Sequence, residues 1–266
     1  MYFYEPTHVC RFFFLSRKSE RMMKMDASKP IIALDFQEID QLNEFLNQFS
    51  EPLNVKIGME LYYTTGTQMV EALQKRGHDI FLDLKLHDIP NTVKWAMKTL
   101  AKQGVAMLNV HAMGGQAMME AARQGIEKGT GEGAKRPVLL AVTQLTSTSP
   151  EQLKQEQLVE ATMAESVNHL AKLTQQAQLD GVVCSPLEAK AIKEKFGEDF
   201  LTVTPGIRLT KGQDDQKRTA TPYEAALNGC DYIVVGRPIT QAEDPVAAYQ
   251  AIKAEWQKGL AEKASF

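Results

Sequence analysis

Residues 81–93 read Phe-Leu-Asp-Leu-Lys-Leu-His-Asp-Ile-Pro-Asn-Thr-Val, and the rest of the chain is interpreted outward from this segment. Side chains on a strand alternate faces with period two, so Asp83 and Lys85 are expected to point the same way. Asp88 lies beyond the strand, because Asp-Ile-Pro interrupts the β pattern. An Asp-x-Lys pair taken alone is most often a simple ion pair at a strand end. Its chemical meaning therefore depends on the sequence around it.

From residue 30 onward, short apolar runs alternate with amphipathic, helix-like segments. The expected strands are 30–34, 53–57, 79–85, 105–110, 138–142, 181–184, 200–203 and 231–235, and the expected helices are 38–49, 68–76, 91–103, 114–127, 159–178, 186–195, 222–228 and 244–258. Helices between consecutive strands imply parallel strands. Repeated eight times, this β–α unit predicts an α/β fold, a single (β/α)8 TIM barrel.

A doubly wound open sheet is the competing fold. No Gly-x-Gly-x-x-Gly follows the first expected strand, which removes the dinucleotide-binding version of that fold. We expect residues 1–27 to be an N-terminal extension outside the fold, disordered in the main, and residues 28–266 to form the catalytic barrel. Met22, Met23 and Met25 are plausible alternative starts, so translation of the extension is an open question.

Composition narrows the function classes. The 266 residues carry a net charge of −3, which argues against a nucleic-acid-binding surface and requires local cations for any anionic substrate. No apolar run reaches the ~18 residues that a membrane span needs. The three cysteines have no metal-binding spacing and indicate a reducing compartment, so we expect a cytoplasmic location.

Polar residues collect where the expected strands end, and barrels of this kind build their sites at those ends. The strand-end residues are Asp35, Lys56, Asp83, Lys85, His111, Thr143, Ser185, Arg208 and Arg237. Gly206 and Gly236 make glycine turns after the last two strands, just before Arg208 and Arg237. Glycine lets backbone N–H groups approach an anion and arginine offers a bidentate fork, so this pair predicts a phosphate clamp.

With these residues in place, the chain resembles the orotidine 5'-phosphate decarboxylase family, and specifically its bacterial short form. The matching motifs are IIALDF (31–36), VKIG (55–58), FLDLKLHDIPNT (81–92), NVHAMGG (109–115), VTPGIR (203–208), DQKR (215–218) and VVGRP (234–238). The resemblance covers about residues 30 to 258. FLDLKLHDIPNT is highly specific, and the order of the other motifs strengthens the match.

The resemblance implies decarboxylation of orotidine 5'-phosphate to UMP and CO2 in de novo pyrimidine biosynthesis, with no metal and no cofactor. Lys85 would protonate C6 of the pyrimidine within a Lys56–Asp83–Lys85–Asp88 network. The active unit would be a homodimer in which Asp88 and Thr92 reach the neighbouring subunit's site. The substrate-binding residues that the resemblance implies are Asp35, Lys56, Asp83, Thr92, Thr146, Arg208, Gln216, Gly236 and Arg237. Phosphate binding would close the polar loop 209–219.

Two other functions compete with this one. Related barrels, such as hexulose-phosphate synthases, use Asp-x-Lys-x-x-Asp to bind Mg²⁺, with a carboxylate at the end of the second strand. This chain has Lys56 there, and an ammonium group repels a divalent cation. A non-catalytic nucleotide-binding barrel would bind UMP without releasing CO2, and the intact charge set argues against it. His111 fits a packed strand-end histidine as well as a site residue, and His87 fits a structural or interface role better.

Overall fold

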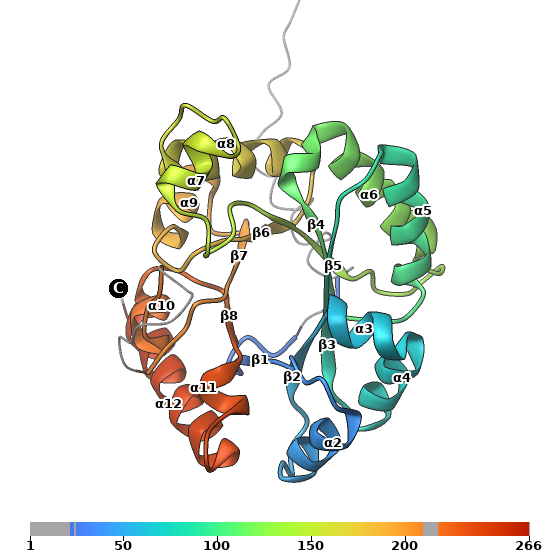
Figure 1. Cartoon of the computed structure of the whole chain (residues 1–266), viewed down its shortest axis with the longest axis vertical. Coiled ribbons are helices and arrows are strands. Elements are labelled where there is room, and N and C mark those ends of the chain that lie inside the picture. Colours follow the sequence, from blue (N-terminus) through green and yellow to red (C-terminus); the bar gives the residue numbers. More distant parts are fainter. Residues whose placement is uncertain (1–21, 24, 210–217, 266) are drawn as a thin grey trace, which may run out of the picture.

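The computed structural model describes residues 22–23, 25–209 and 218–265. Its strands are β1 (Ile31–Ala33), β2 (Asn54–Gly58), β3 (Asp79–Leu86), β4 (Met107–His111), β5 (Val138–Val142), β6 (Gly181–Val183), β7 (Leu201–Thr204) and β8 (Tyr232–Val235). Each pairs in parallel with its neighbours in sequence, and β8 pairs with β1 to close the barrel (Figure 1). The predicted (β/α)8 TIM barrel is therefore confirmed.

Helices surround the strands on the outside of the barrel (Figure 1). They are α2 (Ile39–Asn47), α3 (Met59–Thr65), α4 (Thr67–Lys75), α5 (Pro90–Ala101), the 3-10 turn η1 (Ala112–Gly114), α6 (Gly115–Gly129), α7 (Pro150–Gln155), α8 (Met163–Gln176), α9 (Ala189–Phe196), α10 (Pro222–Leu227), α11 (Arg237–Thr240) and α12 (Pro245–Lys263). The short helices α3, α7 and α11 were not expected from the sequence. None of the helices in the described ranges combines the length and the apolar character that crossing a membrane requires.

Side-chain caps set where several helices begin. The helix expected over 159–178 starts later, because the Thr162 hydroxyl accepts from the Glu165 N–H and the Glu165 carboxylate accepts from the Thr162 N–H. Ser149 and Gln152 form the same reciprocal cap at α7. Each cap satisfies two N–H groups that a helix terminus otherwise leaves without partners. The caps fix the start of each helix more tightly than apolar spacing does.

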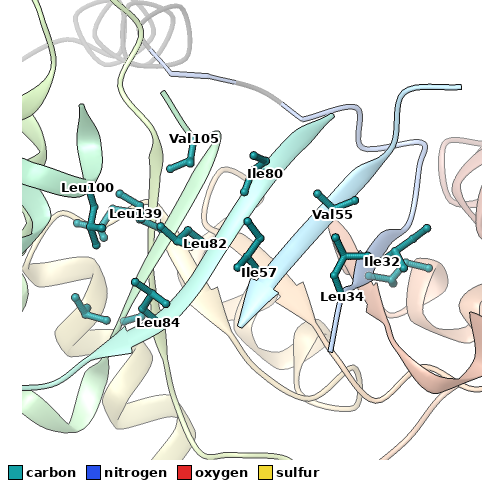
Figure 2. Close-up of a cluster of buried hydrophobic side chains, with 14 of the residues drawn as sticks. Ile32, Leu34, Val55, Ile57, Ile80, Leu82, Leu84, Leu100, Val105 and Leu139 are labelled. Atoms are coloured by element: carbon teal, nitrogen blue, oxygen red, sulfur yellow. The ribbon is translucent and has the colours of Figure 1, made fainter. Parts of the chain in front are cut away.

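The strands bury both faces, which produces two apolar layers. One layer packs between the sheet and the helices, and Figure 2 shows part of it, including Ile32, Val55, Ile57, Ile80 and Leu82. Alternate strand residues point into the barrel and form the second layer together with Met25 and Ala106, which precede β1 and β4. Its strand members are Ile31, Ala33, Phe81, Met107, Val138, Leu140, Val203, Tyr232 and Val234. This interior layer lies below the strand ends and gives the site an apolar floor.

The segment just before the barrel contacts it. The Met23 N–H donates to the Arg136 carbonyl at 2.9 Å, and the Met25 side chain is buried in the interior layer. The Ala27 carbonyl accepts from the Trp256 indole N–H at 2.8 Å. Residues 1–21 and 24 of the predicted extension lie outside the described residues, so the extension itself stays a prediction.

Helices α5 and α6 pack closely because α6 presents glycines to the backbone of α5. A Cβ added at Gly125 would overlap the Lys94 carbonyl, and one at Gly129 would overlap the Lys98 carbonyl. Neither carbonyl can move without distorting α5. The close approach of the two helices therefore depends on these two positions.

We expect Gly125→Ala to lower the free energy of unfolding by about 1–3 kcal/mol, because the added methyl overpacks this helix pair. Urea unfolding of the purified variant measures the change. Gly131→Ala is the matched control, since a Cβ there meets nothing within 4 Å. Equal stability of the two variants would contradict the packing argument.

Candidate active site

Strand β3 carries Asp83 and Lys85 to the carboxyl end of the barrel. Its pairing with β2 is regular through Gly58 and Asp83, but its pairing with β4 shifts register between Leu82 and Leu86. Within that irregular stretch Lys85 has a φ of 49°, in the left-handed region that residues with a Cβ rarely occupy. The strand thus ends in a local distortion at the residue that the sequence singles out.

Four charged side chains form an alternating chain from β1 to β3. The Lys56 ammonium lies 3.1 Å from Asp35 Oδ1 and 3.4 Å from Asp83 Oδ2. The Lys85 ammonium lies 2.8 Å from Asp83 Oδ1. The Asp83 and Lys56 side chains are only 10% and 11% exposed, whereas that of Asp35 is 63% exposed. Asp83 is therefore the buried centre of the chain, and its two oxygens each contact one ammonium group.

Lys56 and Asp83 each stabilise the charged form of the other, although both side chains are buried. Burial works to lower the pKa of Lys56, but the carboxylates of Asp83 and Asp35 outweigh it and raise that pKa. Burial likewise works to raise the pKa of Asp83, but the neighbouring ammonium groups and the Asn109 amide hold it below its ordinary value. Both groups therefore remain ionised at neutral pH.

These charges open onto a cavity of about 430 Å³ at the carboxyl ends of the strands. The sequence-predicted residues that line it are Asp35, Lys56, Asp83, Lys85, Thr146, Arg208, Gly236 and Arg237. The same cavity thus has ammonium and carboxylate groups on β2 and β3 and guanidinium groups after β7 and β8. A small anionic molecule that carries two separate negative groups fits this distribution of charge.

Three predicted binding residues lie elsewhere. Asp88 and Thr92 are exposed at the N-terminus of α5 and do not line this cavity. The Asp88 carboxylate accepts from the Ile89 N–H at 2.6 Å, which fixes the turn into α5. Gln216 lies outside the described residues.

Several strand-end residues have structural contacts instead. The Thr143 hydroxyl donates to the Val183 carbonyl at 3.1 Å, and the Ser185 N–H donates to the Glu188 carboxylate at 2.9 Å. The His111 and His87 rings stack at 5.8 Å outside the cavity lining, and burial lowers the pKa of His111. Of the two interpretations of His111, the structure favours the packed histidine.

Sequence reasoning missed Asn109 on β4. Its side-chain oxygen accepts from the Lys85 N–H at 2.8 Å, and its side-chain nitrogen donates to Asp83 Oδ1 at 2.6 Å. The available signal was an asparagine inside the apolar run 107–110, on the strand next to Asp83 and Lys85. Gln144, Cys184 and Gln241 also line the cavity and were not singled out. Cys184 and Gln144 follow strand ends, where only Ser185 and Thr143 had been noted.

A closed barrel with alternating ammonium and carboxylate groups at the strand ends, and two arginines lining the same cavity, is typical of barrel enzymes with phosphorylated substrates. Residues 28–252 match the model of the Orotidine 5'-phosphate decarboxylase / HUMPS family. The chain belongs to this family.

Similar proteins are found among both sequences and solved structures. The orotidine 5'-phosphate decarboxylase of Listeria monocytogenes serotype 4a is 59% identical over 86% of this chain and 99% of its own length. That of Streptococcus uberis is 58% identical over 87% of this chain and 99% of its own length. The crystal structure of orotidine 5'-phosphate decarboxylase from Lactobacillus acidophilus shares 48% identity and a TM-score of 0.78, covering 86% of this chain and 98% of that one.

We expect Asp83→Asn to lower the free energy of unfolding by about 3 kcal/mol, because it leaves a buried ammonium group without its main counter-charge. Asp35→Asn removes the exposed partner of the same lysine and should cost less than about 1 kcal/mol. Urea unfolding at pH 7 compares the two variants. An equal loss of unfolding free energy in the two variants would show that burial does not make the Asp83 ion pair more important for stability than the Asp35 ion pair.

Proposed function

We propose that this chain decarboxylates orotidine 5'-phosphate to UMP and CO2 in pyrimidine biosynthesis, directly and without metal or organic cofactor. The observation that carries the proposal is the buried Lys56–Asp83–Lys85 chain facing the same cavity as Arg208 and Arg237. Membership of the family and the names of the relatives give the substrate and the reaction.

Direct decarboxylation leaves an electron pair at C6 of the pyrimidine, with no imine to accept it. The barrier that the enzyme must remove is roughly 20 kcal/mol or more. An ammonium group placed where negative charge develops stabilises the transition state and can then donate its proton. We assign this role to Lys85, whose amine is 2.8 Å from Asp83 and faces the cavity.

Asp83 has two effects in this scheme. It fixes both ammonium groups, since each of its oxygens contacts one of them. It would also lie beside the substrate carboxylate, and two adjacent anions disfavour the bound acid relative to the state that has lost CO2. The stabilisation of the transition state by Lys85 is the larger effect, because it acts on the charge that the reaction creates.

The remaining cavity residues would bind the parts of the substrate that do not react. We assign the ribose hydroxyls to Asp35 and Lys56, the phosphate to Arg208, Gly236 and Arg237, and a further contact to Thr146. The resemblance also assigns Gln216, which lies outside the described residues, to the phosphate. A phosphate does no chemistry here, but its binding energy can be used to close the site and exclude water.

A homodimer would complete the site with Asp88 and Thr92 from the neighbouring subunit. Both are exposed, and exposed apolar side chains lie beside them: Ile89 is 68% exposed and Trp95 49%. Met113 and Leu145, which follow the neighbouring strands β4 and β5, are exposed as well. Exposed apolar side chains of this size fit a protein interface on this part of the surface.

Lys56 also argues against the metal-dependent members of the family. Its ammonium group lies 3.4 Å from Asp83, where a divalent cation bound to that carboxylate would have to sit. Repulsion between the two cations makes such a site unfavourable. Cys184 and Cys230 are buried free thiols, which is consistent with an enzyme of the reducing cytoplasm.

We expect the purified chain to convert orotidine 5'-phosphate at the same rate with and without EDTA. The loss of the substrate's ultraviolet absorbance measures this rate. The rate should not depend on a metal because Lys85, and no Lewis acid, neutralises the developing charge. Activity that is lost with EDTA and restored by Mg²⁺ would favour the metal-dependent alternative. UMP binding without CO2 release would favour the non-catalytic barrel.

We expect Lys85→Ala to lower kcat by roughly 10⁴-fold or more, because it removes both the cation and the proton donor. UMP should still bind, since the phosphate-side residues are unchanged, and calorimetric titration measures this. Lys102→Ala, at an exposed lysine after α5, is the matched control and should retain full activity. Turnover in Lys85→Ala close to that of the control would overturn the assignment.

A further inference from the structure

The backbone conformation of Lys85 requires a stabilising contact from the surrounding structure. A left-handed φ is unfavourable for a lysine, and such conformations persist only where the surrounding structure fixes them. Regular pairing with β4 cannot do so here, because the ladder between the two strands is broken from Leu82 to Leu86. The Lys85 N–H therefore needs an acceptor that the sheet does not supply.

The Asn109 side chain is that acceptor. It is 1% exposed and reaches from β4 to the Lys85 N–H at 2.8 Å. Its amide nitrogen donates to Asp83 Oδ1 at 2.6 Å, the same oxygen that contacts the Lys85 ammonium at 2.8 Å. A single planar amide thus joins the backbone of Lys85 to the carboxylate that holds the side chain of Lys85.

At neutral pH, an amide of this length satisfies both partners, because it offers one acceptor and one donor. A carboxylate would place a second negative charge against Asp83, and an apolar side chain would leave the Lys85 N–H and one lone pair of Asp83 without partners. The orientation of the amide is also determined, since its oxygen must face the N–H and its nitrogen the carboxylate. The contact is therefore specific in chemistry as well as in shape.

We propose that Asn109 is a positioning residue for the decarboxylation: it locks Lys85 in its left-handed conformation and orients Asp83, so that the ammonium group is held toward the reacting carbon. Asn109 does not line the cavity and acts through Lys85 and Asp83. The inference rests on the proposed function. In this scheme, Asn109 on β4 sets the position of Lys85, the proposed proton donor on β3.

The test compares Asn109→Ala with Asn54→Ala in steady-state assays with orotidine 5'-phosphate. Asn54 is the matched control because it is also a strand asparagine that is 1% exposed. Its amide donates to the carbonyls of Asp26 and Lys29, which precede β1 at the end of the barrel away from the cavity. We expect Asn109→Ala to lower kcat by roughly 10²-fold with a much smaller change in KM, because misplaced catalytic groups lose transition-state stabilisation. Asn54→Ala should keep its kcat even though it loses stability.

A second variant supplies a pH readout and covers the case in which Asn109→Ala does not fold. Asn109→Asp keeps the shape but is ionised at high pH: the Asp83 carboxylate favours its protonated form, and the Lys85 ammonium on the same Asp83 oxygen favours its ionised form. Its protonated form can again donate to Asp83 and accept from the Lys85 N–H. The ratio of its kcat to that of the wild type should therefore rise as the pH falls.

The outcomes separate this inference from the proposed function. A wild-type chain that releases no CO2 overturns the proposed function and the inference with it. An active wild type with unchanged kcat in Asn109→Ala, or in Asn109→Asp at high pH, overturns the inference alone. So does an equal loss of kcat in Asn109→Ala and Asn54→Ala, or an Asn109→Asp ratio that does not change with pH.

Discussion

The site depends on one buried carboxylate shared between two ammonium groups. The ammonium groups of Lys56 and Lys85, 3.4 Å and 2.8 Å away, and the Asn109 amide lower the pKa of Asp83 against the effect of burial. Asp83 and Asp35 in turn raise the pKa of Lys56. Each ion would be costly to bury alone. Because the side chains come from adjacent parallel strands, the barrel fixes their spacing, and the reacting groups need little rearrangement when a substrate arrives.

Much of this arrangement could be predicted from sequence, because the alternation of side chains along a strand and the location of residues at strand ends determine which side chains meet. The alternation of Asp83 and Lys85 places both inside the barrel, and the rule that barrel sites lie at strand ends brings Lys56, Arg208 and Arg237 to the same cavity. The eight strands were predictable for the same reason, since each is a short apolar run between helical segments. The resemblance to the family then gave these positions specific roles.

What the sequence could not supply was the local backbone and the contacts across strands. Nothing in the residues around Lys85 indicates a positive φ, which coincides with a register shift between β3 and β4. Asn109 was overlooked because its partners are the backbone of one residue and the side chain of another, both on a different strand. The start of α8 was misplaced for a related reason: the cap made by Thr162 outweighs the apolar spacing that begins three residues earlier.

The glycine contacts between α5 and α6 have a consequence for assembly. They hold α5 close against α6, and Asp88 and Thr92 lie at the start of α5. In the proposed homodimer, the groups offered to the second subunit would already occupy their final places in the isolated chain. The conformational entropy of these residues would then be lost when each subunit folds. Association would take place between two nearly rigid surfaces and would not carry this cost.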